Sequence, residues 1–215
     1  MLRILRPTEP LLAIFALITV SLMYGCAYQQ ETFVLEESIC SDSQFFPLLD
    51  YKTSGYIQRD ELVHIGQNLG EKNFKASDES KNIQIGYFNF YKEKIGNPPF
   101  QFPAELLCQT LKFTKAADAE LFKSSLKPTR SSLAITGPGL GYRNSTEIKQ
   151  VDSKNEGTFS LSVYEITLST GGNRFLMVTV YKQYVFITHY GNIKIPVSQR
   201  TATELHDRIL SPFNN

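Results

Sequence analysis

The 215-residue sequence has no tryptophan, few histidines and almost no net charge. It contains 22 Lys and Arg residues and 21 Asp and Glu residues, for a formal charge of +1. Removing the first 25 residues takes away Arg3, Arg6 and Glu9, which leaves 20 of each sign. Proteins that bind nucleic acid need a basic surface to neutralise phosphates. A neutral chain therefore excludes nucleic acid as a partner.

Histidine is also too sparse and too scattered to indicate a metal centre. The three histidines are His64, His189 and His206, and none has the spacing of metal ligands. We therefore expect no metal and no cofactor, and we expect each histidine to be a satisfied core or surface residue. No Gly-x-Ser-x-Gly motif is present, so nucleophilic serine catalysis has no support in the sequence.

The chain has no uninterrupted apolar run of the length that a typical membrane span needs. Residues 11–24 form an apolar run of 14 residues, whereas a spanning helix needs about 20 and a signal peptide about 7–15. Arg3 and Arg6 precede the run, and no Lys or Arg occurs from Cys26 to Tyr51. Because positive charge is retained on the cytoplasmic side, this asymmetry predicts that the bulk of the chain lies outside the cytoplasm.

The end of the apolar run, Met23-Tyr24-Gly25-Cys26, resembles the lipobox of bacterial and some archaeal lipoprotein signals. That motif has Leu, two small residues and Cys, so Gly25 and Cys26 match it, while Met23 and Tyr24 depart from it. The resemblance implies a diacylglycerol-type lipid on Cys26, which would become the first residue after cleavage. The protein would then be lipid-anchored on the cell membrane, facing outward. The alternative is an uncleaved signal anchor, which also places the domain outside the cytoplasm.

The remainder of the chain resembles uncharacterised exported proteins of archaea and bacteria. The matching stretches are LLDYKTSGYIQRDE at 48–61, GLGYR at 139–143, and a Gly-Asn turn before FLMVTVY at 175–181. This group supplies no catalytic residues. It implies an extracytoplasmic domain whose role at the envelope is not defined.

Cysteine is rare, and its odd count is informative in an exported chain. The three cysteines are Cys26, Cys40 and Cys108. Lipidation of Cys26 would leave Cys40 and Cys108 as a candidate disulfide, worth about 4 kcal/mol in the chain-entropy model. The alternative is that Cys108 is a small core residue and Cys40 a free thiol.

The pattern of apolar residues divides the chain into a signal peptide (1–25), an acidic tether (26–45) and a single α+β extracytoplasmic domain (46–215). Aromatic residues, 15 Phe and 11 Tyr, favour strands because flat rings pack well on pleated surfaces. We expect strands at 82–92, 105–113, 158–169, 175–181 and 184–190. The Thr170–Asn173 sequence, TGGN, predicts a hairpin turn. A change of alternation predicts a bulge near Tyr164, and 129–157 is predicted to be rich in loops.

Two amphipathic helices complete the predicted domain. Thr114 is expected to cap a helix that buries Ala117, Leu121, Phe122 and Leu126. Thr201 and Glu204 form a capping-box pattern for the final helix. The order strand-strand-helix thus occurs twice, at 82–126 and 174–210. Hairpin-connected strands with two such helices predict an antiparallel sheet with both helices packed on one face.

Two surface features are candidates for function. Tyrosine presents an apolar ring with a polar tip, so a sheet face carrying several tyrosines is a candidate ligand face; ordinary strand packing is the alternative. Asn144 begins the sequon Asn-Ser-Thr in a predicted exposed loop. The candidate ligand face comprises Tyr87, Tyr91, Tyr181, Tyr184 and Tyr190.

The leading functional hypothesis is a membrane-tethered, non-enzymatic domain that binds an envelope protein or a small ligand. The alternatives are an envelope hydrolase whose dispersed carboxylates converge only in the fold, and a structural assembly factor. A pocket with two carboxylates of perturbed pKa would favour the hydrolase.

Overall fold

A computed structural model describes residues 49–57, 82–94, 102–124, 126, 128–130, 133, 140–157 and 159–211, with side chains from 54 onward. All of these residues belong to one compact unit, Ile39–Asn215. The predicted signal peptide and tether, with Cys26 and Cys40, lie outside the described residues, as does His64.

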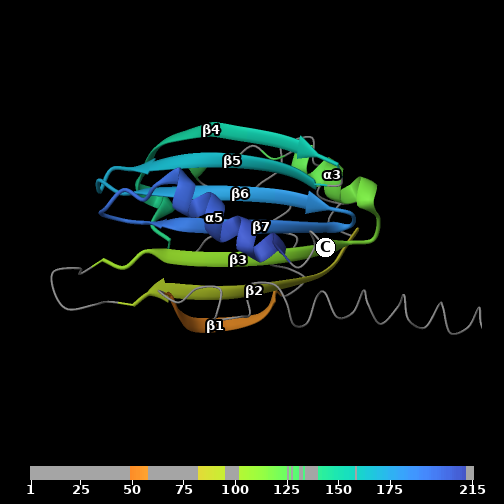
Figure 1. Ribbon diagram of the computed structural model, residues 1–215, viewed down its shortest axis with the longest axis horizontal. Helices are drawn as coiled ribbons and strands as arrows, with labels where there is room; N and C mark the ends of the chain where they lie inside the picture. The colour runs from red at the N-terminus through yellow and green to blue at the C-terminus, as the bar shows by residue number, and fades with distance from the viewer. Residues whose placement is uncertain are drawn as a thin grey trace, which may run out of the picture. The chain divides into compact units, whose positions relative to one another are not determined.

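The described residues form a seven-stranded antiparallel sheet (Figure 1). Its order is β1-β2-β3-β7-β6-β5-β4, and each adjacent pair is antiparallel. The predicted antiparallel α+β class is therefore confirmed. The strands are β1 (Leu49–Ile57), β2 (Ile83–Glu93), β3 (Glu105–Phe113), β4 (Ser145–Glu156), β5 (Phe159–Leu168), β6 (Asn173–Tyr181) and β7 (Tyr184–Asn192).

The two central strands are buried along almost their whole length. Every residue of β7 is buried, and so is every residue of β6 except Tyr181. A strand that is buried on both faces has no side in contact with water, so its sequence is largely a continuous apolar run. The TGGN turn joins β5 to β6 as predicted, with Gly171 at φ +98. Gly172 has no room for a side chain, since a Cβ there would lie 2.0 Å from the Asn192 carbonyl oxygen.

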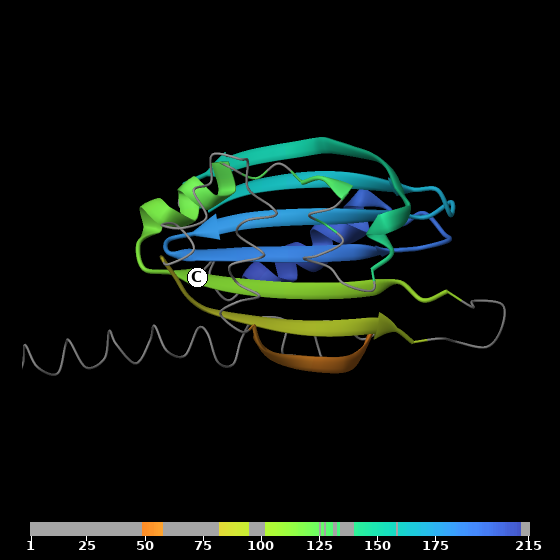
Figure 2. The same cartoon turned by 180° about the vertical axis from the view of Figure 1, so that it is seen from behind.

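The two helices, α3 (Ala116–Ser124) and α5 (Gln199–Leu210), lie on opposite faces of the sheet. Figure 1 shows α5 in front of the strands, and Figure 2, from behind, shows α3 in front. Phe122 of α3 belongs to the core cluster that contains Val178, whereas His206 of α5 hydrogen-bonds to Thr179. Successive residues of a strand point to opposite faces.

The prediction that both helices cover one face is therefore wrong. β6 carries apolar residues on both faces, so each face needs its own cover. We call the two sides of the sheet the α3 face and the α5 face.

The helix boundaries also differ from the predictions. The Thr114 hydroxyl donates to the carbonyl of Asn82 rather than capping α3. Helix α5 begins one turn earlier than predicted, because Ser198 is its cap and accepts from the Thr201 amide at 3.1 Å. In α3, Phe122 is buried as predicted, but Ala117 and Leu121 are exposed.

The predicted loop region contains a twelve-residue strand, β4 (Ser145–Glu156). This strand lies at the edge of the sheet and is mostly exposed, so its sequence is polar and lacks the alternation of a half-buried strand. The pairing of β4 with β5 shifts between Gln150 and Asp152, opposite Tyr164, while β5 pairs regularly with β6. The irregularity expected near Tyr164 thus belongs to β4. The apolar residues in the first half of β5 lie on one face of the sheet and those in the second half on the other, because both faces of β5 are covered.

Candidate functional site

The five tyrosines of the predicted ligand face share the α5 face. Tyr87 and Tyr91 lie in register with Thr110 and Leu106 of β3, which pair in turn with Phe186 and Tyr190 of β7. Tyr181 and Tyr184 face one another at the β6–β7 turn. Tyr91, Tyr184 and Tyr190 are nevertheless buried in the core, and Tyr87 and Tyr181 are half-buried. The shared face is established by the register; a ligand role stays a prediction.

Two other predicted positions can be located. Cys108 is buried on β3, in register with Thr188, and so lies on the α5 face. Because Cys40 lies outside the described residues, their pairing stays a prediction. Asn144 is exposed at the end of a short 3-10 turn (Tyr142–Asn144), one residue before β4. Its glycosylation also stays a prediction.

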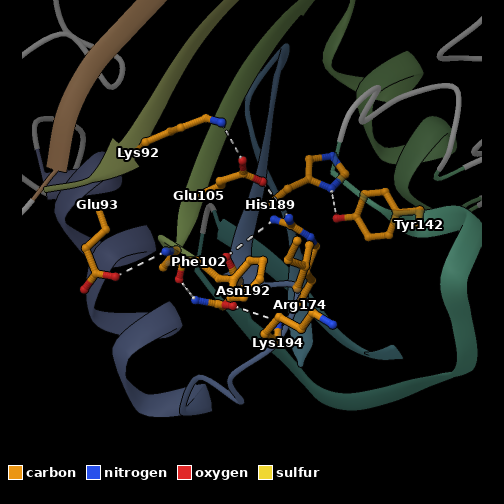
Figure 3. A network of polar contacts seen from close by, with 12 residues as sticks. Lys92, Glu93, Phe102, Glu105, Tyr142, Arg174, His189, Asn192 and Lys194 are labelled. Carbon is orange, nitrogen blue, oxygen red and sulfur yellow. Dashed lines mark hydrogen bonds and ion pairs between the residues drawn. The ribbon is translucent and has the colours of Figure 1, made fainter. Parts of the chain in front are cut away.

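A polar network lies at one end of the sheet, on the α3 face (Figure 3). Its centre is Arg174 on β6, whose side chain is fully buried. The Arg174 Nη2 donates to Glu105 Oε2 at 2.6 Å, and Nη1 donates to the Gly191 carbonyl at 3.5 Å. Glu105 also pairs with Lys92 at 3.0 Å. The Glu105 carboxylate thus pairs with two cations, the buried Arg174 and the partly exposed Lys92.

Tyr142 and His189 extend this network. The Tyr142 hydroxyl lies 2.6 Å from His189 Nδ1, and the Arg174 guanidinium lies 5.9 Å from the Tyr142 ring centroid. Burial raises the pKa of the Tyr142 phenol. Burial, reinforced by the Arg174 charge, lowers the pKa of His189 to about 3. Both groups are therefore neutral, and one hydrogen bond joins the phenol to Nδ1, while Nε2 has no hydrogen-bond partner among the described residues.

This arrangement limits what His189 can do chemically. A general base must lie within reach of a substrate proton, and the His189 side chain is fully buried. The network therefore acts as a rigid connection between β3, β6, β7 and the Tyr142 turn. No local sequence pattern indicates this network, because Glu105 and Arg174 are 69 residues apart and meet only through strand register.

Two asparagines continue the network toward the segment before α5. Asn192 donates to the Phe102 carbonyl at 2.6 Å and accepts from the Lys194 amide at 2.8 Å. Asn173, its cross-strand partner, accepts from the Val197 amide at 2.7 Å. These bonds fix residues 193–197 and so determine where α5 begins.

His206 is the second buried histidine. Its Nε2 lies 2.7 Å from the Thr179 hydroxyl and its Nδ1 lies 2.8 Å from the Thr188 hydroxyl. Burial lowers its pKa to about 4. Both histidines are buried, but the prediction of a satisfied core residue is confirmed only for His206, because His189 Nε2 has no hydrogen-bond partner among the described residues. Within the described part of the chain, no group of three or more His, Cys, Asp or Glu is arranged to hold a metal.

The α3 face carries a groove of about 540 Å³ between α3 and the β4–β5 edge. Lys123, from α3, is half-buried, and burial lowers the pKa of its amine, while the nearby Glu120 carboxylate raises it. Tyr164 is half-buried, and burial raises its pKa, while a hydrogen bond from Ser162 lowers it. We call this the α3 groove; its lining includes Lys123, Leu126, Ile148, Gln150, Ser162 and Tyr164.

The opposite face carries a second groove of about 420 Å³, between α5 and the same sheet edge. Burial raises the pKa of the Asp207 carboxyl; Lys154 lowers it, and Glu156 and Glu204 raise it. Phe159 stacks on Tyr181 with ring centroids 4.6 Å apart. We call this the α5 groove; its lining includes Lys154, Glu156, Phe159, Leu161, Thr203 and Asp207.

Comparison with known proteins gives only distant similarities. No protein-family model and no curated protein matches the sequence. The extracellular domain of PknH from Mycobacterium tuberculosis aligns with a TM-score of 0.46 and 9% identity, over 85% of this chain and 94% of that domain. An uncharacterised protein from Mycobacterium smegmatis aligns with a TM-score of 0.37 and 11% identity, over 79% and 90%. Neither similarity assigns a function to this chain.

Among the described residues, no helix is both long enough and apolar enough to cross a membrane.

Proposed function

We propose that this protein is a membrane-tethered extracytoplasmic domain that binds a ligand or partner at the cell envelope, with the α3 groove as its binding site. The proposed binding role rests on the presence of this groove. Ligand sites are concave, combine apolar lining with convergent polar groups, and typically measure about 300–1,000 Å³. At about 540 Å³ the α3 groove lies within this range.

The groove is built on three regular elements. Lys123 comes from α3, Gln150 from β4, and Tyr164 from β5. Leu126 and Ile148 supply apolar lining between these polar groups. A site built on helices and strands holds its side chains more firmly than one built on loops. The α3 groove can therefore select a ligand by shape.

The test of this site is to fill the groove from its edge. Gln150 is exposed, lies on the α3 face opposite Tyr164, and lines the groove. Gln150→Trp should abolish binding of the neutral fluorescent probe N-phenyl-naphthylamine. Lys149→Trp is the matched control, because Lys149 pairs with Glu165 and points to the other face. A failure of the wild type to bind the probe, or equal binding by both variants, would refute the site.

The tether is the second part of the proposal. The apolar run, the charge asymmetry and Gly25-Cys26 support a lipid on Cys26, and the odd cysteine count supports a Cys40–Cys108 disulfide. The intact mass of protein purified from membranes, with and without reduction and alkylation, tests both. Loss of residues 1–25 with a lipid-sized gain is expected. A full-length mass would identify an uncleaved anchor instead.

Hydrolysis is the second candidate function, and one observation favours it. Glu156 and Asp207 are 51 positions apart, yet they line the same groove on the α5 face. A carboxyl of raised pKa beside a second carboxylate is an arrangement that glycoside and ester hydrolysis uses. Any hydrolysis of nitrophenyl esters or glycosides should then be lost in Asp207→Asn. Activity that survives this substitution would eliminate the α5 groove as its source.

A further inference from the structure

The α3 groove contains a half-buried amine, Lys123, that has no carboxylate partner among the described residues. Lys123 makes no ion pair within 4.0 Å with a described carboxylate, and its amine can only donate. Tyr164 lines the same groove, and its hydroxyl can donate to a bound acceptor. The Lys123 amine therefore lacks a carboxylate partner among the described residues.

The acidic residue of the groove does not supply that acceptor. Glu120 lies one turn before Lys123 on α3, and its carboxylate accepts from the Ser160 hydroxyl at 3.4 Å. It also lines the groove, but no contact within 4.0 Å joins it to Lys123. The Lys123 cation is thus partly withdrawn from water without a direct counter-charge. Such a group gains most from an incoming anion.

The rest of the groove is suited to an apolar body. Leu126 is almost completely buried, and Pro128 and Ile148 are half-buried. A ligand that places an acidic group near Lys123 would lay its remaining atoms against these side chains. An ion alone would leave the apolar lining in contact with water, and a purely apolar ligand would leave the donors unpaired.

We propose that the α3 groove binds an amphipathic ligand with one acidic head group, a carboxylate, sulfonate or phosphate, held by Lys123 and Tyr164. This proposal rests on the proposed function, because it names the ligand class of the same groove. The head group accepts from the Lys123 amine and from the Tyr164 hydroxyl. The apolar body of the ligand packs on Leu126, Pro128 and Ile148.

Two probes that differ only in the acidic group separate the two proposals. Anilinonaphthalene sulfonate has an apolar aromatic body with a sulfonate, and N-phenyl-naphthylamine is the same body without it. The wild type should bind the sulfonate more tightly. Lys123→Gln should weaken sulfonate binding about fivefold, the upper range for a partly exposed charge pair, and leave the neutral probe within about twofold.

The matched control is Lys115→Gln, which removes the same charge at an exposed position just before α3. It should change neither affinity. Tyr164→Phe, which removes one donor and keeps the ring, should weaken the sulfonate about fivefold and spare the neutral probe.

Equal effects of Lys123→Gln on both probes, or an unchanged sulfonate affinity, would overturn the acidic ligand class while the groove remained a site. Binding of neither probe to the wild type would overturn the groove itself, and with it both proposals.

Discussion

The buried guanidinium of Arg174 lies opposite Gly191 on the neighbouring strand, and the missing side chain of the glycine gives it space. A Cβ at position 191 would lie 2.5 Å from both Cα and Cγ of Arg174 and 2.3 Å from the Asn173 carbonyl oxygen. These are distances that real Cβ atoms do not adopt. The glycine therefore permits the Arg174–Glu105 pair that joins β3 to β6 across β7.

Gly191→Ala should destabilise the domain by about 3 kcal/mol, because overpacking forces backbone shifts. Gly55→Ala is the control, since its Cβ would meet only the Phe88 ring at 3.3 Å. Urea unfolding of both variants measures the difference. Equal stability of the two variants would show that the β6–β7 contact is looser than described.

Glu105→Gln should be among the most harmful charge substitutions in the described structure. It leaves Arg174 buried without a carboxylate partner, and breaking a buried pair costs about 3–5 kcal/mol. Glu204→Gln, which removes an exposed pair with Arg200, should cause no measurable loss. Similar unfolding midpoints for the two variants would contradict the burial of this network.

The buried face of α3 can be tested with two adjacent residues. Phe122 is fully buried, and Leu121 is 45% exposed. Phe122→Ala should cost about 3–5 kcal/mol through the cavity that it leaves. Leu121→Ala should be nearly neutral. The reverse order would mean that α3 presents its other side to the sheet.

Stability should fall in acid, because His206 is buried in its neutral form. Its pKa is lowered from 6.5 to about 4 in the folded protein, so the unfolded chain binds more protons between these values. The stabilisation is fully present above pH 6.5 and is lost as the pH falls toward 4. His206 should contribute roughly 2 kcal/mol to the loss between pH 7 and 4.5, and His189, whose pKa is lowered to about 3, adds to it.

Denaturant unfolding of the wild type and His206→Gln at both pH values isolates this contribution from the carboxylates that also titrate. The variant should be less stable at pH 7 and should lose less stability on acidification. Parallel pH profiles for the two proteins would show that His206 is not buried neutral.

The sequence was informative where local chemistry determines local structure. The apolar runs of β6 and β7 and the glycines of the TGGN turn are such signals, and they predicted the hairpins correctly. β4 was missed because an exposed edge strand does not need apolar residues. The opposite placement of α3 and α5 could not be predicted, since β6 is apolar on both faces and so accepts a helix on either.

The site was less predictable than the fold, because its residues meet only through strand register and helix packing. The five tyrosines could be grouped from the sequence, but not placed in the core or at the surface. Glu105 and Arg174, or Lys123 and Tyr164, are ordinary residues in their local sequence. Strand pairing brings Glu105 and Arg174 to one face, and the packing of α3 on that face brings Lys123 to the groove that Tyr164 lines.

The most direct test of the account is to map the binding of anilinonaphthalene sulfonate by amide chemical shifts in isotope-labelled protein. We expect the largest shifts at Lys123, Gln150 and Tyr164, around the α3 groove. Thr203 and Asp207, on the α5 groove, should not move. Shifts concentrated at the α5 groove, or spread evenly over the sheet, would contradict the assignment of the binding site.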